Sequence, residues 1–279
     1  MTSFQSPIQA QRLDTIRVEK VWGRDTLPAP FHKDDGKRIG EIWFDPIPAC
    51  DGVLIKYLFT SEKLSVQVHP SSENALPGEE GKEECWLVID AEPGAKLAIG
   101  FKQVYAPEQV AAAALDGSIE ELLEWHEARE GDVFFMPAGT VHAIGPGLSL
   151  VEVQQNSDTT FRLYDYGRPR ELHLERAMAV ADFGPYAARH RSKVASDEQV
   201  LVDEKHFRFD RVVGLPSEDL RSKYGKGALI LPLKGAVTAA SGEAGADLAS
   251  AQSGQCLYVP ALELADFSDA EVTLLISQR

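Results

Sequence analysis

The chain alternates short apolar runs with turn residues along most of its length. Residues 64–69 read Leu-Ser-Val-Gln-Val-His, and this strict alternation is the period of a half-buried strand. Apolar runs at 53–59, 85–90 and 97–101 predict further strands. Many short strands separated by Gly and Pro corners favour an all-β barrel or sandwich.

The alternation breaks at 106–127, where an Ala-rich stretch follows Pro107. We expect one or two short helices there, because some positions recur at helical spacing: Ile119, Leu122, Leu123 and His126. A further helix is predicted near 173–181.

Strand patterns return on both sides of that second helix. Additional strands are predicted at 41–44, 133–136, 141–144, 148–154, 206–213, 227–233, 255–259 and 271–276. The stretch from Gly235 to Gly254 is rich in Ala, Gly and Ser, and it predicts turns or loose hairpins.

Composition narrows the classes of function. The net charge of −15 makes nucleic acid an improbable partner, although solubility alone also accounts for an acidic surface. No apolar run reaches membrane-helix length, and residues 1–12 lack the apolar core of a signal peptide. The three cysteines form no C-x-x-C pair, so we expect no disulfide framework and a cytoplasmic location.

Four side chains form a candidate metal-binding set. Gln67 and His69 are two residues apart on one predicted strand, so both lie on the same face. His142 lies on a later strand, and Glu84 precedes another. Two imidazoles, a carboxylate and an amide oxygen suit zinc, and also cobalt, manganese, nickel or iron.

Each of these residues alone has an ordinary explanation. A single histidine is more often a hydrogen-bonded core or surface residue, and Glu84 could pair with Lys82 on a solvated face. The combination carries more weight, because Gly131 to His142 reads G-D-x₃-M-P-A-G-x-V-H and resembles the second motif of cupin barrels. The other histidines lack a strand context and are left unassigned: His32, His126, His173, His190 and His206.

The chain also contains a weak internal repeat. Residues 131–138 and 254–261 both read G-x-x-Φ-Φ-Φ-P-A, where Φ is apolar. The second copy continues with Leu262 and Glu263 instead of reaching a histidine. We therefore predict two cupin-like β-barrel or jelly-roll units with a few short helices: a metal-binding unit over 1–185 and a degenerate unit over 186–279.

Four phrases resemble one family more specifically. They lie at 64–70 (LSVQVHP), 81–86 (GKEECW), 137–145 (PAGTVHAIG) and 154–166 (QQNSDTTFRLYDY), in family order. Over roughly residues 20–180 the chain is similar to type I phosphomannose isomerases in their short bacterial form. Long members insert a helical domain, for which this chain offers only 106–127.

The resemblance implies interconversion of mannose 6-phosphate and fructose 6-phosphate with one Zn²⁺ per chain. It implies metal ligands at the same four positions and a catalytic Arg162. Arg168 stands where some members carry a phosphate-binding lysine. Further pocket positions map to Trp22, Glu41, Lys56, Ser65, Lys82 and Glu152.

Each candidate role has a structural alternative. Glu152 is the first candidate for the base, and it is equally well read as a surface carboxylate on a strand; Lys82 is the other proton carrier considered. Arg162 suits stabilisation of an oxyanion or a phosphate, or forms a salt bridge with Asp158 or Asp165. Lys56, Ser65 and Arg168 either complete a phosphate pocket or lie on a solvated surface. Trp22 and Trp86 are expected in the core or the pocket wall.

Other functions remain open at this point. A cupin barrel also suits an Fe(II) dioxygenase or a sugar-binding protein without catalysis, and an isomerase could act on an unphosphorylated sugar. The expected partner is a small sugar phosphate, with neither nucleic acid nor membrane. The expected assembly is a monomer or homodimer.

Overall fold

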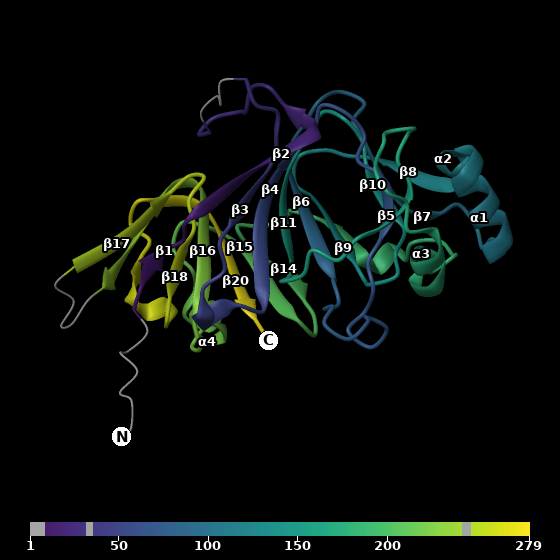
Figure 1. The fold of residues 1–279 in the computed structure, drawn as a ribbon. Coiled ribbons are helices and arrows are strands. Elements are labelled where there is room, and N and C mark those ends of the chain that lie inside the picture. Colours follow the sequence, from purple (N-terminus) through teal and green to yellow (C-terminus); the bar gives the residue numbers. More distant parts are fainter. Residues whose placement is uncertain (1–8, 32–35, 242–246) are drawn as a thin grey trace.

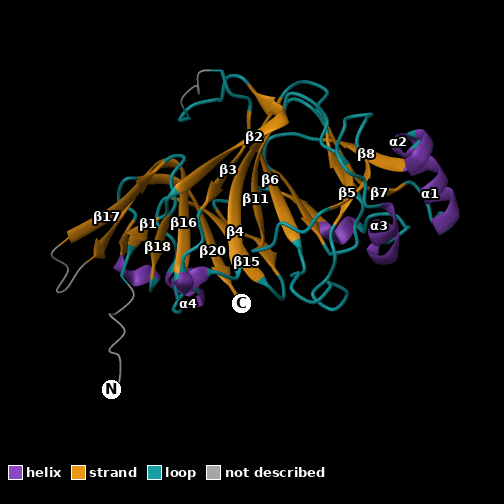
Figure 2. Cartoon of the chain, viewed as in Figure 1, coloured by secondary structure: helices purple, strands orange, loops and turns teal. Residues whose placement is uncertain are grey.

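Three antiparallel sheets lie side by side along the molecule, and helices α1 (Pro107–Asp116), α2 (Ile119–Leu122) and α3 (Leu174–Val180) gather at the end opposite strand β17 (Asp247–Gln252) (Figure 1 and Figure 2). The computed structural model describes residues 9–31, 36–241 and 247–279. His32 therefore lies outside the described residues. The predominance of strands confirms the predicted all-β class. None of the helices in the described part of the chain has the length and apolar character needed to span a bilayer.

The central sheet has seven strands in the order β13-β9-β6-β11-β4-β3-β2. They are β2 (Thr15–Arg24), β3 (Ile39–Phe44), β4 (Val53–Phe59), β6 (Glu84–Ala91), β9 (Asp132–Met136), β11 (Leu148–Gln155) and β13 (Arg191–Lys193). The apolar runs at 53–59, 85–90, 133–136 and 148–154 thus coincide with observed strands.

The small sheet has five strands in the order β12-β5-β10-β7-β8. They are β5 (Val66–Val68), β7 (Lys96–Phe101), β8 (Leu123–Glu127), β10 (His142–Ile144) and β12 (Phe161–Tyr164). It faces the central sheet across an apolar cluster that includes Trp22, Leu58, Trp86 and Ile144.

The C-terminal sheet packs on the other face of the central sheet. It contains β1 (Gln11–Arg12), β14 (Glu198–Asp203), β15 (Phe207–Val213), β16 (Ala228–Ser241), β17 (Asp247–Gln252), β18 (Leu257–Val259), β19 (Ala265–Asp266) and β20 (Ala270–Gln278). One core cluster joins side chains of both sheets, for example Tyr57 and Phe59 with Phe209 and Leu274.

Strand periodicity explains why both faces of the central sheet are buried. On β4, Ile55, Tyr57 and Phe59 belong to the core shared with the C-terminal sheet, whereas Leu58 faces the small sheet. Period two therefore places the even-numbered side chains of β4, including Lys56, on the side of the small sheet. Polar groups on that face are enclosed between two sheets, and this is where the candidate site forms.

Three of the described helices lie beside the small sheet, and the fourth lies at the lower edge of the C-terminal sheet (Figure 1). They are α1 (Pro107–Asp116), α2 (Ile119–Leu122), α3 (Leu174–Val180) and α4 (Glu218–Lys223), with 3-10 turns η1 (Pro48–Cys50), η2 (Ala188–His190) and η4 (Leu262–Leu264). Helix α1 begins with Pro107 and ends at Gly117, whose φ of 87° only glycine adopts easily.

One local prediction was wrong. Residues 123–127 form strand β8, not the end of a helix, because the free edge of β7 offers their backbone a hydrogen-bonding partner, and Leu97 pairs with His126. Between Gly235 and Gly254 the described residues form a hairpin, one of the two predicted alternatives, since Ala236–Ser241 pair with Asp247–Gln252.

The repeated phrases adopt the same local structure. Gly131 and Gly254 both have φ of 83°, and a strand follows each of them. The division into units at about residue 185 stays a prediction. Two strand pairs join residues from both sides of this boundary. Strand β1 pairs with β18 in the C-terminal sheet, and β13 pairs with β9 in the central sheet.

Candidate metal centre and active site

His69, Glu84 and His142 converge between the central and the small sheets. Their ligand atoms lie within 4.8 Å of one another, and all three residues are buried. His142 Nε2 is 3.3 Å from Glu84 Oε1, and His69 Nε2 is 3.5 Å from Glu84 Oε2. Residues from β6, β10 and the end of β5 thus form one group with two imidazoles and a carboxylate.

Backbone carbonyls orient both imidazoles. His69 Nδ1 lies 2.8 Å from the Thr159 carbonyl oxygen, and His142 Nδ1 lies 2.9 Å from the Thr140 carbonyl oxygen. Because a carbonyl only accepts, each Nδ1 carries the proton and each Nε2 presents a lone pair toward Glu84. This is the arrangement in which outer partners fix the tautomer of a metal-binding histidine.

Gln67 lies beside this group. It is paired in register with His142 on β10, and its amide Nε2 is 3.2 Å from His142 Nε2. Its Oε1 accepts a hydrogen bond from Ser65 Oγ at 3.2 Å. The two ends of an amide exchange by a half-turn, and a hydroxyl both donates and accepts. The turned amide presents Oε1 to the ligand group while Ser65 still has a partner.

The Glu84 carboxylate fits a cation. Burial alone would raise the pKa of Glu84, but the ammonium of Lys82 at 2.9 Å holds that pKa below its ordinary value. Among the described residues, neither oxygen of Glu84 has a hydrogen-bond partner of good geometry. Burial lowers the pKa of His142 and, together with Lys82, that of His69, so both rings are neutral at neutral pH. A carboxylate and two imidazole Nε2 lone pairs therefore meet the requirements of a divalent metal. The metal would replace the present partners of the two rings, which are Lys82 Nζ at 3.3 Å from His69 Nε2 and the Gln67 amide at His142 Nε2.

A cavity of about 420 Å³ opens beside this group. Gln67 and Lys82 contribute to its wall and so connect it to the ligand group. Five Lys and Arg residues line it against three acidic residues, in a chain whose net charge is −15. The other lining residues are Lys20, Trp22, Glu41, Trp43, Lys56, Leu58, Leu64, Ser65, Ile144, Glu152, Asp158, Thr160, Arg162, Arg170 and His173.

Glu152 lies in the cavity wall and is held at both oxygens. Trp86 Nε1 donates to Oε2 at 2.9 Å, and Lys56 Nζ is 3.1 Å from Oε1. The three residues are direct cross-strand neighbours on β6, β11 and β4. Glu152 is 4% exposed, so it is not the surface carboxylate of the alternative interpretation. Burial lowers the pKa of Lys56 although Glu152 counteracts this.

Two arginines, Arg162 and Arg170, line the cavity on the side of the small sheet, opposite Glu152 of the central sheet. Arg162 is paired in register with Gln67, and the guanidinium forms no ion pair with Asp158 or Asp165. Burial, with Arg170 nearby, lowers the pKa of Arg162. The alternative role of Arg162, a salt bridge with Asp158 or Asp165, is therefore absent among the described residues, and Asp165 is occupied by Arg170, with two hydrogen bonds of 2.6 Å.

Arg168 and His173 lie differently with respect to this cavity, and the role of Arg168 stays a prediction. Arg168 does not line the cavity; its guanidinium bonds instead to the Lys63 carbonyl at 2.8 Å and to Glu62 at 3.0 Å. His173 was left unassigned from the sequence, yet it lines the cavity. Its position before α3 carries no strand pattern, so the periodicity of the chain could not reveal it.

The remaining predicted residues lie in the cavity wall. Trp22 is 3% exposed and lines it, in accord with the expected wall position. Glu41 accepts a hydrogen bond of 2.6 Å from Trp43 Nε1 and lies 3.3 Å from Lys20. Sequence reasoning missed Lys20, Trp43 and Arg170. For Trp43, its position two residues after Glu41 on one strand was the available signal.

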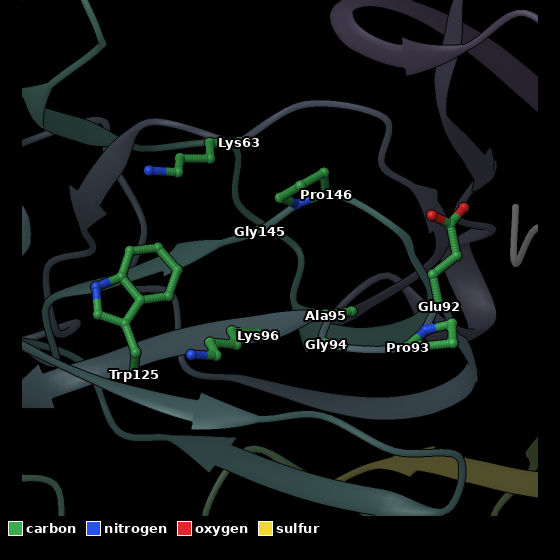
Figure 3. Close-up of a pocket in the computed structure, with 9 residues that line it drawn as sticks. All are labelled: Lys63, Glu92, Pro93, Gly94, Ala95, Lys96, Trp125, Gly145 and Pro146. Atoms are coloured by element: carbon green, nitrogen blue, oxygen red, sulfur yellow. The ribbon is translucent and has the colours of Figure 1, made fainter.

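A second cavity, of about 390 Å³, lies outside this site (Figure 3). Figure 3 shows Lys63, Lys96 and Trp125 on one side and Glu92 on the other. None of its lining residues was predicted as a site residue, and none belongs to the metal-ligand group. We therefore place the candidate active site in the first cavity.

The fold and the ligand group together define a cupin-like β protein with a candidate metal site. The curated protein mannose-6-phosphate isomerase ManA of Bacillus subtilis (strain 168) is 42% identical over 159 residues, which are 54% of this chain and 50% of that protein. The mannose-6-phosphate isomerase of Streptococcus mutans is 41% identical over 140 residues, or 47% of this chain and 44% of that one. The chain spans about half the length of the curated relatives it matches. No family model matches the chain.

Solved structures confirm the fold along nearly the whole chain. The mannose 6-phosphate isomerase from Bacillus subtilis superposes with a TM-score of 0.75 at 22% identity, covering 96% of this chain and 99% of that one. A zinc-bound mannose 6-phosphate isomerase superposes with a TM-score of 0.72 at 14% identity, covering 97% and 99%. These comparisons confirm the resemblance to phosphomannose isomerases that the four phrases indicated.

Proposed function

We propose that this chain is a metal-dependent aldose–ketose isomerase that interconverts mannose 6-phosphate and fructose 6-phosphate. One observation carries the proposal: the buried ligand group lies next to one positively lined cavity, whose wall contains an oriented carboxylate (Glu152) and a guanidinium (Arg162) that forms no ion pair within the described part of the chain. The activity for which the curated relatives are named supports it.

One zinc ion per chain is proposed at His69, Glu84 and His142, with the Gln67 amide oxygen as fourth ligand. The name of the zinc-bound structural neighbour supports the choice of metal. When bound, zinc polarises the substrate carbonyl and stabilises the negative charge that develops on its oxygen. The two histidines need no proton loss to bind it, since their Nε2 atoms already present lone pairs.

Glu152 is proposed as the base that moves the carbon-bound proton. In the aldose-to-ketose direction it takes the proton from C2 and returns it to C1, while the hydroxyl proton of O2 passes to O1, so atoms balance and the carboxylate is regenerated in each turnover. Trp86 and Lys56 hold its two oxygens, yet a carboxylate has further lone pairs that accept the proton. Lys82 is less suited as the base because its ammonium is engaged with Glu84 at 2.9 Å.

Arg162 is proposed to stabilise the charge of the enediol-like intermediate from the opposite wall. Its register with Gln67 puts it beside the ligand group, and Arg keeps its charge at any working pH. Trp22, Glu41, Lys56 and Ser65 are proposed to contact the sugar, since each lines the cavity.

The test is conversion of mannose 6-phosphate by the purified protein, before and after chelation and with zinc restored. Loss and recovery of activity would support the proposal, and inactivity of the zinc-loaded protein would refute it. Unphosphorylated mannose is assayed in parallel, because conversion of mannose would show that the substrate needs no phosphate. Oxygen consumption with Fe(II) tests the dioxygenase alternative, and sugar binding without turnover tests the sugar-binding alternative.

Cytoplasmic location and a monomeric or homodimeric state stay proposals. The three cysteines, Cys50, Cys85 and Cys256, are buried and unpaired, which is compatible with a reducing compartment. A small sugar phosphate is the proposed partner, with no nucleic acid and no membrane.

A further inference from the structure

Asp165 is a buried carboxylate held between two arginines. It is 2% exposed, and Arg170 donates to both of its oxygens at 2.6 Å through Nε and Nη2. Arg168 Nη1 lies 3.4 Å from the same carboxylate. The planar fork of Arg170 is therefore fixed by Asp165, and its Nη1 edge has no hydrogen-bond partner among the described residues.

The turn after β12 separates the two arginines. Tyr166 and Gly167 both have positive φ, of 56° and 74°, and the Arg168 N–H donates back to the Asp165 carbonyl at 3.0 Å. This reversal directs Arg168 toward Glu62 and the Lys63 carbonyl, away from the cavity. Arg170 lines the cavity instead.

His173 lines the same part of the cavity with a defined tautomer. The Arg162 N–H donates to His173 Nδ1 at 3.2 Å, and the His173 N–H donates to the Arg162 carbonyl at 2.8 Å. Because Nδ1 accepts, the neutral ring carries its hydrogen on Nε2. The ring therefore provides a donor that its bond to Arg162 leaves unused.

We propose that Arg170, positioned by Asp165, and His173 bind the phosphate group of the substrate, in place of Arg168. The inference rests on the proposed function, because it assigns the anionic end of that substrate. A guanidinium with one edge fixed and the other edge free matches the oxygens of a phosphate, and Nε2–H of His173 adds a neutral donor. The alternative is that Arg170 only neutralises the buried Asp165.

The first experiment compares Arg170→Gln with Arg168→Gln in steady-state kinetics on mannose 6-phosphate. We expect Arg170→Gln to raise KM roughly 10- to 100-fold, as is typical when hydrogen bonds to a charged group are lost, with kcat changed less than about threefold. Arg170→Lys keeps the charge beside Asp165 and is expected to give a smaller rise. Arg176→Gln, which removes an arginine that pairs with Glu79 outside the cavity wall, is the control. A KM rise in Arg168→Gln but not in Arg170→Gln would overturn the inference.

His173→Asn supplies a separate test. Its short amide can still accept from the Arg162 N–H, but it removes the Nε2 donor. We expect KM for mannose 6-phosphate to rise roughly 3- to 10-fold, the range for one neutral hydrogen bond. An unchanged KM in a folded His173→Asn protein would remove His173 from the proposal.

A binding measurement separates this inference from the proposed reaction. Calorimetric titration with a hexitol 6-phosphate and with the parent hexitol needs no turnover, and the ratio of the two affinities reports the contribution of the phosphate. We expect a preference for the phosphate in the wild-type chain that falls at least tenfold in Arg170→Gln. If the chain proves to be no isomerase, this ratio still decides whether Arg170 binds the phosphate group. Equal binding of both ligands by the wild type, or an unchanged ratio in the variant, would overturn the inference.

Discussion

Trp86 donates its indole N–H to a carboxylate oxygen of Glu152 at 2.9 Å, across neighbouring strands of the central sheet. The same indole packs edge-on against His142, with ring centroids 5.3 Å apart. One buried side chain thus contacts both the proposed base and a proposed metal ligand. Trp86 is a positioning residue in this arrangement, since it lies behind the groups that would meet the substrate.

Trp86→Phe separates these two contacts. The phenyl ring keeps an aromatic surface against His142 but no longer donates to Glu152. We expect kcat to fall roughly tenfold or more, because a lost hydrogen bond to a charged group costs about 1.5–3 kcal/mol. Zinc affinity should change much less than kcat. Trp125→Phe, in the second cavity, is the matched control and should change neither quantity.

Glu84→Gln tests the ligand group directly. The substitution keeps the shape of the side chain and removes its charge, so Lys82 loses its partner at 2.9 Å. Zinc affinity should fall by roughly 100-fold or more, since loss of an outer-sphere partner alone costs roughly 10- to 100-fold. Zinc titration against a competing chelator gives the constant. An affinity within a factor of three of the wild type would mean that Glu84 does not bind the metal.

Acid should destabilise the metal-free protein in a defined pH window. Burial lowers the pKa of both His69 and His142, so the unfolded chain, with histidine pKa of about 6.5, binds more protons than the folded chain below that pH. Stability is therefore full above about pH 6.5 and declines as pH falls, by at most roughly 1.4 kcal/mol per pH unit for each histidine. The lowered pKa of Glu84 also makes stability fall with acid, but in a separate pH range below the ordinary pKa of a glutamate.

Urea unfolding at pH 7.5 and 5.5 in the presence of chelator measures this decline. His142→Gln should show a shallower dependence on pH than the wild type, because one of the two buried neutral imidazoles is gone. His206→Gln changes a histidine outside the cavity and should keep the wild-type dependence. A metal-free wild type equally stable at both pH values would contradict the expectation.

The sequence predicted best where burial follows a simple period. The strand at 53–59 was predicted to the residue, and Gln67, predicted on a strand, lies in register with His142. Periodicity could not show that β7 has a free edge, and so 123–127 was read as helix although it pairs there. The residues of the candidate site divide in the same way, into those that periodicity indicates and those that tertiary contacts place. The proposed ligands His69, Glu84 and His142 were identified from strand patterns, whereas Arg170 and His173 follow a turn whose direction depends on tertiary contacts.

The C-terminal sheet contributes no residue to the cavity wall, so it should affect stability rather than turnover. Within it, Tyr224 is 1% exposed, and its hydroxyl lies 2.6 Å from Asp210 Oδ2 and 2.8 Å from the Leu275 carbonyl. Asp210 also accepts two hydrogen bonds from Arg208, at 2.6 and 2.8 Å. A buried carboxylate depends on such partners for its charge.

Tyr224→Phe removes only the hydroxyl from this network. We expect the free energy of unfolding to fall by about 1–3 kcal/mol, because Asp210 loses one donor while Arg208 still neutralises it. In the folded protein kcat and KM should match the wild type, since no cavity group moves. Urea unfolding and steady-state kinetics on the same preparation provide both values. A change in kcat or KM at full folding would show instead that the C-terminal sheet shapes the active site through the core it shares with the central sheet.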